Sequence, residues 1–80
     1  MREKLHKILD LVLDLNEQGA TRSNVDFSGY VENVSVMVWE GECTDENMLL
    51  HDYTYYGGKL RNEKKLNDII RELEEVKENI

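Results

Sequence analysis

The chain has 80 residues, a net charge of −7 and a sequence pI of about 4.7, with 40% hydrophobic and 34% charged residues. This length predicts one domain, residues 1–80, with a thin core and little room for a deep substrate cavity, and the composition is too apolar for a disordered chain. The acidic charge disfavours direct binding to nucleic acid, because phosphates repel such a surface. The charge suits a basic protein partner, although solubility alone also explains it.

Cysteine content and hydropathy indicate in which cellular compartment the protein resides. Cys43 is the single cysteine, which excludes an intramolecular disulfide and fits a reducing cytoplasm. No apolar run approaches the roughly 20 residues of a membrane span. The N-terminal segment is basic and then apolar, but Asp10 and Asp14 interrupt it and no small-residue cleavage site follows, so we expect no signal peptide. We therefore expect a cytoplasmic protein that does not enter a membrane.

Residues 2–18 show the pattern of an amphipathic helix. Apolar side chains recur at alternating spacings of three and four, at Leu5, Ile8, Val12 and Leu15. Gly19 is a suitable C-terminal stop. Residues 20–24 then form a polar connection, and Val25–Phe27 is a candidate for a short first strand that Ser28 and Gly29 would end.

The centre of the chain predicts a β-hairpin, with strands at about 31–40 and 48–56 flanking the polar segment 41–47. In the first of these strands three valines alternate with other residues, at Val34, Val36 and Val38. Either face of that strand could pack on the helices. We prefer the valine face, because β-branched residues pack well on a half-buried sheet surface. Met37 and Trp39 would then lie on the outer face.

The second strand of the hairpin has no clean polar face. One face carries Leu49, His51, Tyr53 and Tyr55, and the other carries Met48, Leu50, Asp52, Thr54 and Tyr56. Residues 61–79 predict the second helix, with Asn62 as N-cap and a stripe of apolar residues from Leu66 to Ile80. The fold class is therefore α+β, with two terminal helices packed on one face of a small antiparallel sheet of two or three strands. The order is α-β-β-β-α or α-β-β-α.

The residues that could support catalysis or metal binding do not form a recognisable set. His51 and Asp52 are neighbours on a strand and point to opposite faces, so they cannot easily bind one ion together. Cys43 has no base and orienting group at a recognisable spacing. We therefore expect no enzyme, no metal site and no cofactor.

A basic cluster surrounds the start of the second helix. Its members are Lys59, Arg61, Lys64 and Lys65, which follow Gly57 and Gly58. The glycine and lysine spacing of a phosphate-binding loop is absent. The cluster is a candidate anion site, but a solvated helix start is the better explanation.

Aromatic residues give the strongest indication of a binding surface. Trp39, Tyr53, Tyr55 and Tyr56 fall on adjacent predicted strands, and such residues are enriched in protein interfaces. They could instead stabilise the sheet as cross-strand pairs. We predict that Met37, Trp39, Tyr53 and Tyr55 form a partner-binding face, for another protein or for a second copy in a homodimer.

Several local features occur together in one stretch of the chain, NVDFSGYVENVSVMVWEGE. The motif aromatic-Ser-Gly-aromatic-Val stands at Phe27–Val31, a strand runs from Val34 to Gly41, and amphipathic and charged helical segments lie on either side. In these features the chain resembles a group of small proteins encoded by phages and prophages of Gram-positive bacteria. Tyr30 stands where that group more often has a histidine. The group has no established activity, so the resemblance implies only a cytosolic accessory protein that acts on host machinery.

These observations lead to one principal hypothesis, a non-enzymatic module that binds a host or phage protein. One specific version is an inhibitor that mimics a nucleic-acid surface and blocks a host defence or DNA-handling protein. The alternatives are a small-ligand or nucleotide-binding protein, with a pocket between the aromatic face and the Lys59–Lys65 cluster, and a structural homo-oligomer built through the Leu66–Ile80 stripe or the sheet face.

Overall fold

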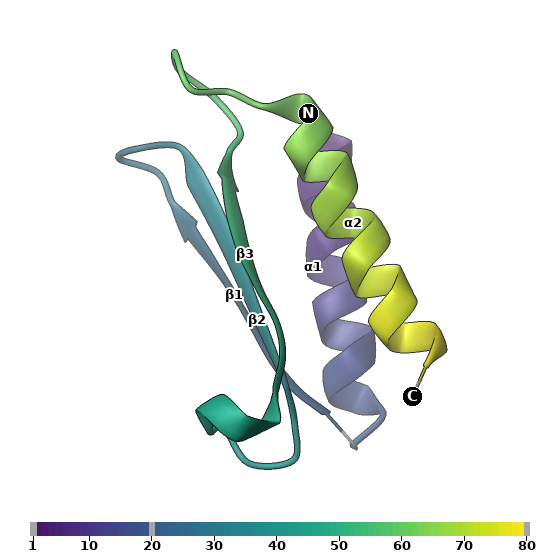
Figure 1. The fold of residues 1–80 in the computed structure, drawn as a ribbon. Coiled ribbons are helices and arrows are strands. Elements are labelled where there is room, and N and C mark those ends of the chain that lie inside the picture. Colours follow the sequence, from purple (N-terminus) through teal and green to yellow (C-terminus); the bar gives the residue numbers. More distant parts are fainter. Residues whose placement is uncertain (1, 20, 80) are drawn as a thin grey trace.

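A computed structural model describes residues 2–19 and 21–79. It contains two helices, α1 (Arg2–Glu17) and α2 (Glu63–Glu78), and three strands, β1 (Thr21–Ser28), β2 (Asn33–Glu40) and β3 (Met48–Tyr55). A 3-10 turn, η1 (Asp45–Asn47), lies between β2 and β3. The order is thus α-β-β-β-α, the longer of the two predicted orders (Figure 1).

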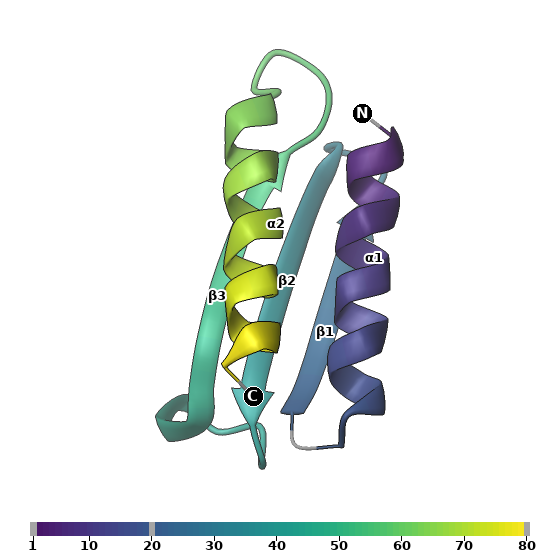
Figure 2. The ribbon, with the colours of Figure 1, turned by 90° about the vertical axis from the view of Figure 1, so that its right-hand side faces the viewer.

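The molecule has two layers. The strands form one antiparallel sheet in the order β1-β2-β3. Both helices lie on the same face of this sheet and run in the same direction, as Figures 1 and 2 show. Two ion pairs of 2.8 Å join the helices near their matching ends, Lys4 with Glu63 and Lys77 with Asp14. None of the described elements covers the opposite face of the sheet, which we call the outer face.

The core lies between the sheet and the helices, and the predicted orientation of β2 is confirmed. Val34, Val36 and Val38 are fully buried. They pack with residues from the two helical stripes, namely Ile8, Leu11, Val12, Leu15, Leu66, Ile69 and Leu73. Leu66, Ile69 and Leu73 of the α2 stripe are buried in this core, whereas Val76 is only partly buried. Ile80, the last residue of the predicted stripe, lies outside the described residues.

Strand β1 is longer than predicted, and the expectation of a polar connection over residues 21–24 is wrong. Thr21 Oγ1 donates a hydrogen bond of 2.7 Å to the carbonyl of Leu15, and Ser23 Oγ donates one of 2.9 Å to the carbonyl of Val12. These polar side chains therefore point into the sheet–helix interface, and Thr21 satisfies the carbonyl of Leu15, which is one of the last four carbonyls of α1 and has no regular donor within the helix. The first residue of the predicted connection, Ala20, lies outside the described residues.

The predicted helix boundaries are largely confirmed. Gly19, just beyond α1, has a φ of 79°, a value that glycine adopts without steric cost. Asn62 caps α2, because its side chain accepts a hydrogen bond of 3.0 Å from the backbone N–H of Lys65. Helix α2 starts after Asn62 rather than at Arg61, since Arg61 and Asn62 are held to the end of β3 through Tyr55. No described helix has the length and hydropathy needed to cross a membrane.

Candidate functional site

The outer face of the sheet consists of four cross-strand rows, in which each β2 residue stands between one from β1 and one from β3. Trp39 stands between Arg22 and Met48, and Met37 between Asn24 and His51. Ser35 stands between Asp26 and Tyr53, and Asn33 between Ser28 and Tyr55. The four residues predicted to bind a partner, Met37, Trp39, Tyr53 and Tyr55, therefore share this face.

The aromatic and methionine side chains of the outer face are only partly covered. Tyr53 is 56% exposed, while Met37, Trp39 and Tyr55 are half-buried against their cross-strand neighbours. Tyr56 does not join them. Its ring makes an edge-to-face contact with Phe27, with centroids 6.5 Å apart, and it packs against the core on the helix side. The outer face thus presents Trp, Tyr, Met and His side chains, which are typical of interface centres.

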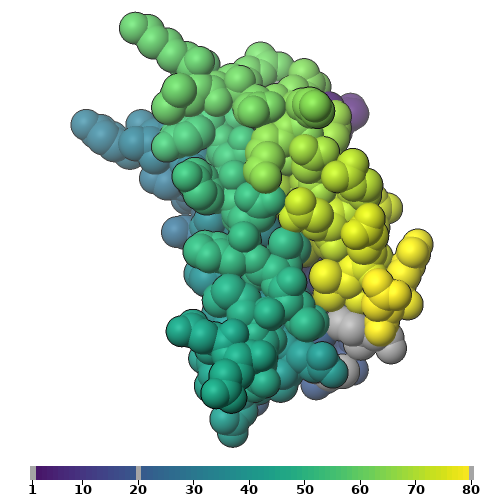
Figure 3. Space-filling view, viewed as in Figure 1, coloured from purple at the N-terminus to yellow at the C-terminus, as the bar shows by residue number. Residues whose placement is uncertain are grey.

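Formal charge is scarce on the outer face. Arg22 and Asp26 are the charged residues of opposite sign in its four rows. An acidic border lies beside it, because η1, with Asp45 and Glu46, projects on the side of the sheet away from the helices (Figure 1). The space-filling view in Figure 3 shows this segment as part of the protruding lower end of the molecule. The outer face is therefore a near-neutral surface with an acidic border.

The acidic residues gather at the end of the molecule where both helices finish and where β2 connects to β3 (Figure 1). We call this the acidic end; its residues are Asp14, Glu17, Glu40, Glu42, Asp45, Glu46, Glu72, Glu74, Glu75 and Glu78. The negative end of a helix dipole is an unfavourable place for carboxylates. In the last two turns of α2, Lys77 is the single cation beside four glutamates. Glu75 has an ion-pair partner one turn earlier, Arg71 at 4.0 Å, but the glutamates as a group oppose the helix dipole.

The predicted basic cluster lies at the other end of the molecule, where α2 begins. Two of its members have carboxylate partners. Lys65 Nζ lies 2.9 Å from Asp52 Oδ2, which raises the pKa of Lys65, and Arg61 Nη2 lies 3.8 Å from Glu63 Oε2. A shallow recess of about 400 Å³ beside the cluster is lined by residues that include Tyr53, Tyr55, Lys65 and Asp52. The recess therefore lies where the nucleotide alternative placed its pocket, and it carries charges of both signs.

Comparison with protein-family models, with curated proteins and with solved structures finds no match to this chain. Among residues 2–19 and 21–79, no group of three His, Cys, Asp or Glu side chains is placed to hold a metal ion. Cys43 is exposed.

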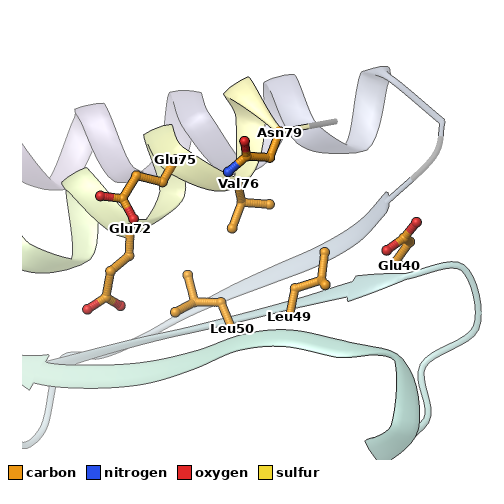
Figure 4. A pocket seen from close by; sticks show the side chains of 7 residues that line it. All are labelled: Glu40, Leu49, Leu50, Glu72, Glu75, Val76 and Asn79. Carbon is orange, nitrogen blue, oxygen red and sulfur yellow. The ribbon is translucent and has the colours of Figure 1, made fainter.

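A groove of about 620 Å³ lies at the acidic end, between α2 and the start of β3. Its floor is apolar and its rim is polar and acidic (Figure 4). It is lined by Leu49, Leu50 and Val76 together with Glu40, Glu72, Glu75 and Asn79. Burial raises the pKa of Glu72, and the negative charge of the neighbouring Asp52 raises this pKa further. We call this feature the acidic groove.

An irregularity in β3 creates the floor of the acidic groove. Val38 pairs with Leu50 and Trp39 pairs with Met48, so that Leu49 is an extra residue in β3. Leu49 and Leu50 both point toward α2 in Figure 4. The prediction that Leu49 shares a face with His51, Tyr53 and Tyr55 is therefore wrong. Three consecutive apolar residues, Met48 to Leu50, break the strand alternation and were the one sequence signal of this bulge.

Proposed function

We propose that this protein is a non-enzymatic binding module that docks a host or phage protein on the outer face of its sheet. The observation that supports this most strongly is that Met37, Trp39, Tyr53 and Tyr55 share a face that no described element covers. An antiparallel sheet with one solvated face ordinarily carries polar side chains there. Here each of the four rows also carries a large side chain beside its polar residues, namely Trp39, Met37, Tyr53 or Tyr55.

The energetics of such a face favour a protein partner. Burial of a large apolar side chain is worth about 1.5–3 kcal/mol, and the binding energy of an interface is concentrated in a few residues such as Trp and Tyr. The near-neutral rows avoid the cost of desolvating many charges. The acidic border at η1 would select and orient a partner with a basic rim, through charge complementarity.

A more specific form of the proposal concerns the target. The partner is a host defence or DNA-handling protein, and the protein acts as its inhibitor in the host cytoplasm. The acidic end supports this form, since its carboxylates would occupy the positions of nucleic-acid phosphates on a basic surface. The resemblance to small phage and prophage proteins supports a bacterial host of the Gram-positive type.

A capture experiment with matched variants tests the binding proposal. The tagged protein is incubated with a Gram-positive bacterial lysate, and bound proteins are identified by mass spectrometry. We expect Tyr53→Ala to remove one stoichiometric partner, while Leu13→Ala, at a residue of similar exposure on α1, retains it. High salt should weaken the same complex. A partner that survives Trp39→Ala, Tyr53→Ala and high salt without loss of affinity would contradict the proposal.

The small-ligand alternative rests on the recess beside the basic cluster. Tyr53, Tyr55 and Lys65 line it and would provide stacking and one positive charge for a nucleotide. Trp39 lies at the opposite end of β2 from this recess, so its fluorescence is a poor reporter. Amide shifts of Tyr53 and Lys65 during titration with nucleotides are the better measurement. An unchanged spectrum at millimolar nucleotide removes this alternative.

A further inference from the structure

We propose that the acidic groove of one molecule binds the turn after β3 of a second copy, which produces head-to-tail association. The inference goes beyond the proposed function, because it uses neither Tyr53 nor the rest of the outer face. The two complementary features lie at opposite ends of a molecule whose longest extent is 36 Å. The turn of one molecule therefore cannot reach the acidic groove of the same molecule.

The turn is defined by residues 58–61 and displays an apolar side chain between two cations. Leu60 is 65% exposed and stands between Lys59 and Arg61, both of which are exposed. An exposed leucine with charged neighbours on both sides is a ready anchor for an apolar site with a charged rim. Figure 3 shows that the segment between β3 and α2 stands out from the rest of the surface.

Backbone hydrogen bonds fix the shape of this turn before any partner is bound. The N–H of Arg61 donates to the carbonyl of Gly58 at 3.4 Å, and the N–H of Asn62 donates to the carbonyl of Tyr55 at 3.0 Å. Gly58 has a φ of 72°, which glycine adopts without steric cost. A preformed turn loses less conformational entropy on binding than a flexible segment does.

The acidic groove is complementary to this turn in size, apolarity and charge. Its volume of about 620 Å³ accommodates the tip of a turn, and Leu49, which is 43% exposed, forms part of its apolar floor. Glu40, Glu72 and Glu75 surround that floor and would face Lys59 and Arg61. Cations at this position also relieve the repulsion between the glutamates at the C-terminal end of α2.

The two surfaces differ, so the contact is heterologous and each copy offers one groove and one turn. Such a contact continues from copy to copy, either closing into a ring or extending as a chain. The contact is small, and small interfaces are weak, so we expect a dissociation constant on the order of 10⁻⁴ M. Leu60 also lines the recess beside Tyr53 and Tyr55, so the contact would lie at the edge of the outer face and would leave Met37 uncovered.

Sedimentation of two variants, alone and mixed, tests the inference. Leu60→Asp removes the anchor and Leu49→Asp blocks the groove, and both changes are at exposed positions, so circular dichroism should show retained folding. Each variant alone should associate at least about tenfold more weakly than the wild type. An equimolar mixture should form 1:1 dimers and nothing larger, because one intact groove meets one intact turn. A mixture in which no dimer forms would overturn the inference.

A charge variant supplies a matched control. Lys59→Glu should weaken association, whereas Lys64→Glu, which changes the net charge equally but lies outside the turn, should have a much smaller effect. Equal effects of the two changes would show that only net charge matters and would overturn the inference. Three further results would do the same: a wild-type protein that stays monomeric at millimolar concentration, loss of association on Tyr53→Ala, and occupation of the groove by a different protein with no self-association.

Discussion

Lys65 on α2 and Asp52 on β3 form an ion pair across the helix–sheet interface, with Nζ of the lysine 2.9 Å from Oδ2 of the aspartate. Both charges of this ion pair act on the carboxyl of Glu72, which is also on α2. Burial and the adjacent Asp52 together raise the pKa of Glu72, so that folding favours the protonated form of its carboxyl. Glu72 lines the acidic groove and links the stability of the domain to pH.

Glu72→Gln should stabilise the protein at pH 7. In the wild type, the ionised Glu72 destabilises the fold above its folded-state pKa, and this penalty disappears as the pH falls below the unfolded value, where the carboxyl is protonated in both states. The advantage of the variant should therefore shrink as the pH falls through the raised pKa. Urea unfolding at pH 7 and at acidic pH measures this difference. Glu78→Gln, at an exposed position on the same helix, is the control.

The two faces of β2 should respond differently to truncation. Val36 is fully buried beneath the helices, so Val36→Ala should lower the free energy of unfolding by about 2 kcal/mol, because it leaves a cavity in a thin core. Met37, its neighbour, lies on the outer face, and Met37→Ala should cost clearly less. Chemical denaturation of both variants provides the comparison. A larger loss of unfolding free energy for Met37→Ala would indicate that the core lies on the Met37 face of the sheet, which would contradict the structure.

The hydrogen bond from Thr21 to the carbonyl of Leu15 should matter for stability. Thr21 is 2% exposed, and Thr21→Val would leave that carbonyl without its donor at similar side-chain volume. We expect a loss of about 1–3 kcal/mol in the free energy of unfolding. Thr21→Ser keeps the hydroxyl and should cost less. If the two variants are equally stable, the hydroxyl does not contribute.

Glu32 has a φ of 52° in the connection between β1 and β2, a left-handed conformation that is costly for a residue with a Cβ. Its carbonyl accepts a hydrogen bond of 2.8 Å from the N–H of Tyr56, so the backbone there is fixed. Glu32→Gly should raise the melting temperature, by an amount corresponding to about 1 kcal/mol. Glu32→Ala removes the same carboxylate but keeps the Cβ, and it should show no such gain.

Most of the fold was predictable because apolar residues recur with a clear period along the chain. The stripes in α1 and α2 and the alternation of Val34, Val36 and Val38 are strong patterns, and the structure confirms the layers they indicate. Strand β1 was largely missed because Thr21 and Ser23 are polar residues on a buried face. Their partners are carbonyls of α1, and a contact of this kind leaves no hydrophobic period in the sequence.

Of the two candidate sites, the outer face was predictable from the sequence and the acidic groove was not. Met37, Trp39, Tyr53 and Tyr55 share a face because each strand alternates regularly in the region that contains them. The acidic groove could not be found in the same way. It depends on the bulge at Leu49, for which the apolar run Met48 to Leu50 is the one local signal, and on the packing of α2 over β3, which is set by tertiary contacts.

The central claim is that the outer face of the sheet contacts the partner, and site-specific photo-crosslinking tests it most directly. A photoreactive amino acid replaces Tyr53 on the outer face in one variant and Leu13 on α1 in another; the two positions are 56% and 49% exposed. Both proteins are irradiated in the bacterial lysate, and crosslinked species are identified by mass spectrometry. We predict that one protein is crosslinked through position 53 and not through position 13. Crosslinking of the partner through position 13 alone would contradict binding through the outer face.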